Sequence, residues 1–210
     1  QQFRKRGIGT LLVTAICGEL KRYGVPKALL VQDRRSVAAQ GFLASCDAQY
    51  VFSEYAMRLS AVPEHPVMKE LTIRRAHADD VDALAAVCSG AYGEQQHHSK
   101  TYITACFVAH DRFAYLASVD SRIVGSCFVH DRGPTVSLHM VAVDPAYQGK
   151  GVGTALVTAV VQLAAYRDRI VELEVNSTND RALRVYRNVG FEVTDEFAYH
   201  AIPLQRLASR

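Results

Sequence analysis

The stretch that decides the fold lies between positions 143 and 154 and reads Val143-Asp144-Pro145-Ala146-Tyr147-Gln148-Gly149-Lys150-Gly151-Val152-Gly153-Thr154. It predicts a strand that ends in a turn of glycines, and the apolar run 155–165 then predicts a helix. The first backbone N–H groups of such a helix have no intrahelical acceptor, and the helix dipole adds positive potential there. The turn is therefore suited to hold a phosphate group, which predicts a phosphorylated cofactor.

Two widespread phosphate-binding patterns do not fit this turn. A P-loop needs Ser or Thr directly after Gly-Lys, whereas Lys150 is followed by Gly151. A dinucleotide fingerprint that starts at Gly149 needs a third glycine where this chain has Thr154. The turn resembles instead the Q/R-x-x-G-x-G/A signature of the GCN5-related N-acetyltransferases (GNAT), and the residues that match it are Gln148, Gly151 and Gly153.

A second motif of this family lies further along the chain, after the β-branched run 170–175 that predicts a strand. The segment 179–191 resembles the family's N-x-x-A-x-x-x-Y-x-x-x-G-F element, with matches at Asn179, Ala182, Tyr186, Gly190 and Phe191. On a helix that the glycine ends, one face carries Ala182, Val185, Tyr186 and Val189. With two specific motifs in the family's order, the chain is identified as a member of the GNAT superfamily.

The predicted elements follow the order of the acetyltransferase fold, β-α-α-β-β-β-α-β-α-β-β, over roughly residues 71–206. The resemblance implies an α/β (α+β) protein with a mixed sheet. Helices are predicted at 79–92, at 99–109, after the glycine turn and in the second motif. The predicted strands are 71–75, 113–119, 122–130, 135–143, 170–175, 191–197 and 199–204.

The resemblance also implies a site for acetyl-CoA as the acetyl donor. In the family two central strands splay apart, and the pantetheine arm pairs with the backbone of the strand before the glycine turn. The glycines let backbone N–H groups approach the pyrophosphate closely. Asn179 caps its helix and touches the cofactor, although capping alone also explains an asparagine there. The implied cofactor-binding residues are Val141, Ala142, Val143, Gln148, Gly149, Lys150, Gly151, Val152, Gly153, Thr154, Asn179 and Tyr186.

Direct attack of an amine on the thioester needs a neutral amine and a proton for the departing thiolate. Tyr186 matches the family's thiolate-protonating tyrosine; the alternative is a half-buried tyrosine whose hydroxyl only reaches water. The glutamate that some relatives place on the strand before the turn falls at Ser137, so that carboxylate is missing. His139 lies on the same face of the strand and is a substitute base, although a lone strand histidine is more often structural. Glu172, Glu174 or a chain of waters are the alternatives.

No metal is expected. The pair His97-His98 at the head of the second helix lies near the acceptor mouth in the usual topology, where it could meet a carboxylate or a phosphate. A third ligand at suitable spacing is missing from the sequence pattern. The five cysteines are odd in number and form no C-x-x-C pair, so we expect them to be reduced and mostly buried.

The chain contains an internal repeat. The segment Gly7-Ile8-Gly9-Thr10-Leu11-Leu12-Val13-Thr14-Ala15 recurs 144 residues later, and this offset gives 11 identities over the 53 positions from 7 to 59. Ordinary composition gives roughly 3 or 4 by chance. The first copy starts at its glycine turn, without the strands that should precede it. It therefore packs against a second domain or a second chain, or else the sequence is a fragment, which the missing initiator methionine favours.

The first copy is also chemically degraded. Tyr186 aligns with Phe42, and Asn179 aligns with Arg35. We therefore expect residues 1–59 to be a partial, non-catalytic half domain. Residues 60–70 then form a linker, and 71–210 form the complete acetyltransferase domain.

Composition places the chain among globular proteins. It has 210 residues, 49% of them hydrophobic, and a formal net charge of +3, which is too small to indicate nucleic-acid binding. No apolar run is long enough to span a bilayer, and the first residues lack a signal core. The sequence therefore predicts a cytoplasmic protein without nucleic-acid or membrane partners.

The predicted function is acetyl-CoA-dependent N-acetylation of a primary amine, with Tyr186 as general acid. Two alternatives stay open. One is a non-catalytic acyl-CoA sensor or scaffold, favoured by the degraded first copy and the missing glutamate. The other is acetylation of a protein N-terminus or lysine, because no motif describes the acceptor.

Overall fold

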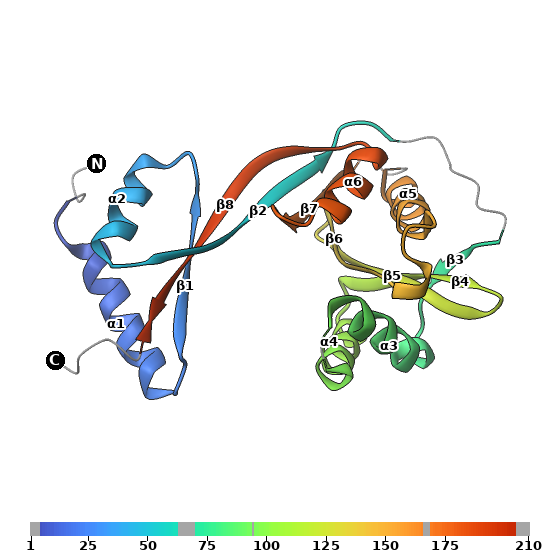
Figure 1. Cartoon of the computed structure of the whole chain (residues 1–210), viewed down its shortest axis with the longest axis horizontal. Coiled ribbons are helices and arrows are strands. Elements are labelled where there is room, and N and C mark those ends of the chain that lie inside the picture. The colour runs from blue at the N-terminus through green and yellow to red at the C-terminus, as the bar shows by residue number, and fades with distance from the viewer. Residues whose placement is uncertain (1–4, 63–69, 94, 166–168, 205–210) are drawn as a thin grey trace. The chain divides into compact units, whose positions relative to one another are not determined.

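The computed structural model describes residues 5–62, 70–93, 95–165 and 169–204. These residues divide into two compact units, which are described separately (Figure 1). The second unit comprises Met57–Val175 and Asn179–Thr194, and the first comprises the remaining described residues. Most of the linker expected at 60–70 lies outside the described residues.

The second unit is built on a mixed sheet with the strand order β7-β6-β5-β4-β3. Neighbouring strands from β3 to β6 are antiparallel, whereas β6 and β7 run parallel. The strands are β3 (Thr72–Arg75), β4 (Arg112–Val119), β5 (Arg122–Asp131), β6 (Thr135–Val143) and β7 (Ile170–Asn176). Apolar runs such as the buried residues Val124–Val129 agree with a sheet covered on both faces.

Helices cover both faces of this sheet (Figure 1). On one face lie α3 (Val81–Tyr92), which follows a short 3₁₀ turn at Ala78–Asp80, and α4 (Gln96–Val108). On the other face lie α5 (Val152–Ala165) and α6 (Asp180–Val189). The core under α3 and α4 consists of Leu84, Ala85, Cys88, Ile103, Cys106, Leu116, Phe128 and their neighbours.

The first unit contains α1 (Ile8–Arg22), β1 (Lys27–Asp33), α2 (Val37–Ser45) and most of β2 (Gln49–Leu59). The far end of β8 (Phe191–Pro203) also belongs to this unit. Here the strand order is β1-β8-β2, and β1 pairs antiparallel with β8 from Lys27↔Pro203 to Asp33↔Phe197. Its core is small and is built around Cys17, Ile202 and Leu204.

The sequence expectation was wrong at the end of the chain. Two closing strands were predicted at 191–197 and 199–204, but β8 is one strand from Phe191 to Pro203. The residue at the expected break, Ala198, is buried, and its pairing partner on β1 is Gln32. Neither glycine nor proline occurs near it to end the strand, so the pairing continues through it.

The second helix begins earlier than expected, at Gln96 instead of Ser99, so His97 and His98 lie in its first turn. The expected state of the cysteines is confirmed: all five are free, and only Cys46 is not fully buried. No helix in the described parts of the chain is long and apolar enough to cross a membrane.

Candidate active site

A cleft of about 980 Å³ opens in the second unit beside the end of β6. Its walls come from the end of α3, the last residues of β6, the glycine turn, the start of α5 and one side of α6. The two motifs, which are separated along the sequence, therefore meet across one cavity. The expected residues that line it are Val141, Ala142, Val143, Gln148, Gly149, Gly151, Gly153, Thr154, Asn179 and Tyr186.

The strand β6 leaves its parallel neighbour before it reaches the cleft. Its register with β7 runs from Thr135↔Ile170 to Leu138↔Leu173. The pairing of β6 with β5 shifts its register between Ser126 and Phe128 of β5. In β6, Met140 has a φ of 46°. Such a β-bulge at a non-glycine residue in the left-handed region bends the strand and changes the direction of the residues beyond it. The three residues after the bulge therefore line the cleft instead of continuing the pairing with β7.

The backbone of this last part of β6 offers acceptors to the cleft. The carbonyl oxygen of Val141 accepts a hydrogen bond from the Tyr92 hydroxyl at 3.0 Å. The carbonyl oxygen of Val143 accepts one from Nε2 of Gln148, also at 3.0 Å. Both donors are side chains that can rotate away. A bound ligand with amide groups can therefore replace them without disturbing the sheet.

The turn after β6 needs its glycines. Gly149 and Gly151 have φ values of 76° and 85°, in the region that other residues rarely adopt. A Cβ on Gly153 would lie 3.5 Å from Cγ2 of Val143, so the helix start packs closely on β6. Since α5 begins at Val152, its first-turn N–H groups have no intrahelical acceptor and provide an anion site at the edge of the cleft.

Two residues of the expected cofactor set do not line the cleft. The ammonium of Lys150 lies over the ring of Tyr147, 5.1 Å from its centroid. The side chain of Val152 is buried in the core.

Tyr186 is held at the cleft by α6. Asn179 is the N-cap of this helix, and its Oδ1 accepts a hydrogen bond from the backbone N–H of Ala182 at 3.1 Å. Gly190 ends the helix with a φ of 102°, and a Cβ there would lie 2.7 Å from the carbonyl oxygen of Ala61. Only 8% of Tyr186 is exposed, and burial raises the pKa of its phenol well above the usual value. Its hydroxyl is therefore protonated at neutral pH.

The face predicted for α6 is divided between the core and the cleft. The buried residues are Leu183, Tyr186 and Val189, at a spacing of three. The expected members Ala182 and Val185 line the cleft instead. Helical periodicity alone does not distinguish these two neighbouring stripes, because Tyr186 and Val189 belong to both.

His139 does not line the cleft. Its ring packs between Phe128 and Tyr102, with centroid distances of 6.0 and 6.2 Å. Burial lowers the pKa of His139, although a hydrogen bond with the Ser137 backbone opposes this shift. Among the described residues, no group bonds to its buried Nε2 atom. The imidazole is therefore neutral at physiological pH.

Ser137 and Glu172, the next positions considered for the base, are paired across β6 and β7. The Ser137 hydroxyl donates a hydrogen bond to Oε1 of Glu172 at 3.2 Å, so a carboxylate from β7 stands beside the serine.

The exposed rings of His97 and His98 lie 6.1 Å apart in the first turn of α4. In the described part of the chain no three His, Cys, Asp or Glu side chains are arranged to hold a metal ion.

The sequence did not predict several residues of the cleft wall, among them Tyr92, Arg181 and Arg184. Tyr92 is the last residue of α3, and no local pattern connects it to the glycine turn. The two arginines could have been predicted from the sequence. They lie near the start of a helix that faces the glycine turn, and basic side chains at such a place are suited to bind anions.

This arrangement of a bulged strand, a glycine turn and a tyrosine helix defines a class of enzymes. Residues 79–191 match the acetyltransferase (GNAT) family, more than half of the chain. The chain belongs to the GNAT family, whose enzymes use acetyl-CoA, and it is an acetyltransferase with one GNAT core. The expected fold class is thereby confirmed.

The chain is homologous to mycothiol acetyltransferase. The enzyme of that name from Actinosynnema mirum is 31% identical over 201 residues, which cover 90% of this chain and 67% of that protein. The N-alpha-acetyltransferase RimI from Mycobacterium tuberculosis is 47% identical over 55 residues, which cover 26% of this chain and 34% of that protein. The chain thus spans two thirds of the first relative and matches one third of the second.

Solved structures show the same fold. A GCN5-related N-acetyltransferase from Sphaerobacter thermophilus superposes with a TM-score of 0.77 at 23% identity, covering 97% of this chain and 70% of that chain. A tandem GNAT protein from the clavulanic acid biosynthesis pathway superposes with a TM-score of 0.75 at 17% identity. It covers 96% of this chain and 71% of that one.

Proposed function

We propose that this chain transfers the acetyl group of acetyl-CoA to the primary amine of a small molecule. The observation that carries the proposal is the cleft, which is lined by the part of β6 that does not pair with β7, by the glycine turn and by Tyr186. The turn offers first-turn N–H groups to a pyrophosphate, and β6 offers the carbonyl groups of Val141 and Val143 to an amide-bearing arm. Within the cleft lining, the structure places no carboxylate that would repel such an anionic ligand.

Tyr186 is the proposed general acid. When the amine nitrogen attacks the thioester, a C–N bond forms, the C–S bond breaks, and the sulfur leaves with the electron pair. The Tyr186 hydroxyl supplies the proton that the sulfur takes up. Its burial supports this role, because a phenol with a raised pKa carries its proton at every physiological pH.

The amine must lose a proton, and His139 is the proposed base. It lies two residues before Val141 on β6, and its lowered pKa keeps the imidazole neutral. Because its ring lies outside the cleft lining, a water must carry the proton from the amine to the imidazole. Glu172, which holds Ser137, is the competing acceptor at the end of such a chain.

A small-molecule acceptor is favoured over a protein N-terminus by the extent of the similarity. The mycothiol acetyltransferase from Actinosynnema mirum, which is named for a small molecule, aligns over 90% of this chain, whereas the N-alpha-acetyltransferase RimI aligns over 26%. The mycothiol acetyltransferase alignment also includes most of the first unit.

We also infer that residues 1–59 are a degenerate half copy of the catalytic unit. The order of elements supports this: shifted by 144 residues, α1, β1, α2 and β2 begin within two residues of α5, β7, α6 and β8. The apolar face of α1 is exposed where the matching face of α5 is buried against the sheet. On this basis the chain divides into a half copy at 1–59, a linker at 60–70 and the acetyltransferase domain at 71–210.

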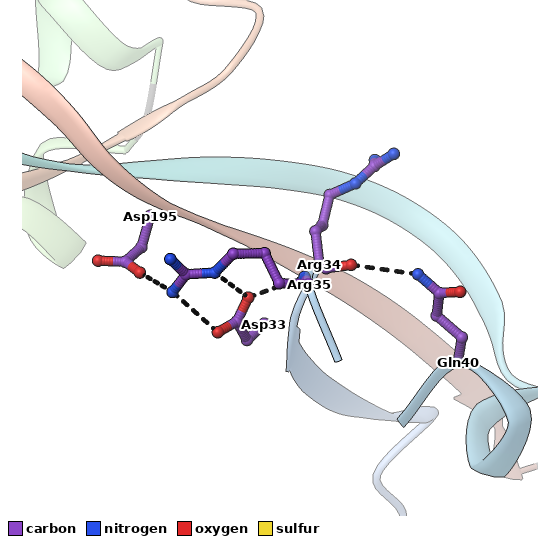
Figure 2. A network of polar contacts seen from close by, with 5 residues as sticks. All are labelled: Asp33, Arg34, Arg35, Gln40 and Asp195. Atoms are coloured by element: carbon purple, nitrogen blue, oxygen red, sulfur yellow. Dashed lines mark hydrogen bonds and ion pairs between the residues drawn. The ribbon is translucent and has the colours of Figure 1, made fainter. Parts of the chain in front are cut away.

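The half copy has lost the chemistry of its counterpart. Arg35 stands at the position of Asn179, and its guanidinium binds both oxygens of Asp33 at 3.1 and 3.0 Å (Figure 2). The same guanidinium also pairs with Asp195. The guanidinium is thus occupied by two carboxylates, and the group as a whole keeps one negative charge, which does not favour a phosphate. This supports a non-catalytic role for the first unit.

The test combines binding with turnover. Calorimetry with acetyl-CoA measures binding, and a free-thiol release assay over a panel of small amines and N-terminal peptides measures transfer. We expect binding, and release with at least one small amine. Release with peptides alone would replace the small-molecule acceptor by a protein. Binding without release on any amine would favour an acyl-CoA sensor.

A further inference from the structure

The charges in the cleft are all of one sign. Of the described residues that line it, only Arg181 and Arg184 are charged, and both lie on α6. They are three positions apart, so their side chains emerge on neighbouring parts of the helix surface. The cleft therefore presents two cations on one wall, in addition to the uncharged backbone N–H groups of the glycine turn.

Arg181 already reaches the start of the glycine turn. Its Nη1 atom donates to Oε1 of Gln148, and Nε2 of the same glutamine donates to the Val143 carbonyl. The partner of the guanidinium is thus a neutral amide, and in the described structure no carboxylate forms an ion pair with either arginine. A guanidinium has five N–H donors in a planar fork that fits a phosphate with two parallel hydrogen bonds. Arg181 therefore keeps both its charge and most of its donors for a ligand.

The position of Arg181 along α6 points to the nucleotide end of the cofactor. Tyr186 follows it by five residues, which is about 7 to 8 Å along a helix axis. In the proposed function Tyr186 stands at the sulfur end of coenzyme A. Arg181 is displaced from it toward Gln148 and the turn that receives the pyrophosphate.

We propose that Arg181, supported by Arg184, binds the 3′-phosphate on the ribose of coenzyme A. This inference rests on the proposed function. Coenzyme A carries three phosphoryl groups, two in its pyrophosphate and one on the ribose. The backbone N–H groups of the glycine turn serve the pyrophosphate. The third group, the 3′-phosphate, is a monoester with two negative charges, and the guanidinium groups of Arg181 and Arg184 on α6 are the cations that bind it. The cleft thereby distinguishes coenzyme A from 3′-dephospho-coenzyme A.

Calorimetry with two ligands tests the inference on the full chain. Coenzyme A should bind about 10-fold more tightly than 3′-dephospho-coenzyme A, which corresponds to one charged hydrogen-bonded contact. In Arg181→Gln this preference should fall to about 3-fold or less, and in Arg181→Gln/Arg184→Gln it should vanish. Arg187→Gln is the matched control, because Arg187 lies on the same helix outside the cleft lining and should keep the full preference.

The outcomes separate this inference from the function on which it rests. Equal binding of the two ligands by the unsubstituted chain would overturn the inference and leave the acetyltransferase proposal standing. If Arg181→Gln weakened both ligands by the same factor, the arginine would hold the pyrophosphate, and the 3′-phosphate assignment would be wrong. If neither ligand bound the folded chain, both proposals would be overturned.

Discussion

The helices α1 and α5 carry the same sequence pattern but have opposite surroundings. In α5 the residues Val152, Ala155, Leu156 and Val160 are 2, 5, 0 and 1% exposed. Their counterparts in α1, Ile8, Leu11, Leu12 and Ile16, are 45, 71, 59 and 57% exposed. The helix α5 packs on β4, β5 and β6, whereas the described residues of the first unit form no strands that correspond to these three. An apolar stripe thus predicts which face a helix can bury, while the partner decides whether that face is buried.

The two regions also differ where the cofactor site would lie. In the second unit Tyr186 and Gly153 border an open cleft. In the first unit the matching residues, Phe42 and Gly9, touch: a Cβ on Gly9 would lie 2.9 Å from Cε2 of the phenyl ring. The ring therefore rests directly on the helix start that corresponds to the phosphate turn. The described part of the first unit thus has the glycine pattern of the turn, but an aromatic ring lies against it where the second unit has a cleft.

The largest expected difference between the two regions is in stability. Leu156→Ala removes a fully buried side chain, which should lower the free energy of unfolding by about 2 to 5 kcal/mol. Leu12→Ala, at the aligned position, should change it by no more than about 0.5 kcal/mol, because that side chain is mostly exposed. Urea unfolding of both variants measures the difference. A similar loss in both would mean that the face of α1 is buried in solution.

The next prediction concerns the aligned aromatic residues. Tyr186→Phe should lower kcat by about 10²-fold or more and leave the affinity for acetyl-CoA unchanged, because only the proton donor is removed. Phe42→Tyr restores the hydroxyl in the first unit and should add no activity, since its ring rests on Gly9. Thiol-release kinetics and calorimetry separate the two quantities. Full turnover by Tyr186→Phe would exclude the tyrosine as the acid.

Much of this comparison was predictable from the sequence, because its signals are local. The glycine turn, the N-cap Asn179 and the tyrosine helix are encoded by residues that are close together in the chain. The bulge at Met140 and the contribution of Tyr92 to the cleft were not predictable in this way. Both depend on contacts between elements far apart in the sequence, and methionine has no propensity that signals a positive φ.

The sequence did not predict that β8 is continuous, for a related reason. The predicted break at residue 198 treats the strand as two local segments, but its pairing with β1 comes from the other end of the chain. A partner so far away in sequence leaves no local trace in the alternation of side chains.

A smaller effect is expected at the helix caps. Asn179→Ala removes a side-chain acceptor for the N–H group of Ala182 and should cost about 1 kcal/mol of stability. The aligned change, Arg35→Ala, removes only exposed ion pairs, because Ser36 caps α2 in that copy. Its cost in stability should be smaller than that of Asn179→Ala, because exposed ion pairs contribute little. Thermal unfolding of both variants measures which of them loses more stability. An equal loss would show that the ion pairs of Arg35 stabilise the first unit as strongly as a helix cap does.

The smallest effect is the pH dependence that His139 contributes, on a strand that has no counterpart among the described residues of the first unit. Burial lowers the pKa of His139 in the folded chain below the value of about 6.5 expected after unfolding. As the pH falls below 6.5, the unfolded chain therefore takes up a proton that the folded chain does not, and the free energy of unfolding decreases. The decrease continues down to the folded pKa, by less than about 1.4 kcal/mol for each pH unit. Above about 6.5 this contribution is constant.

Two variants test this pH dependence. His139→Gln and His139→Phe both remove the titrating group, so both should lose less stability than the unsubstituted chain between about pH 7 and 5.5, whatever their stability at neutral pH. Urea unfolding at several pH values measures these slopes. If both variants kept the original slope, the pKa of His139 would be the same in the folded and the unfolded chain, and burial would not lower it.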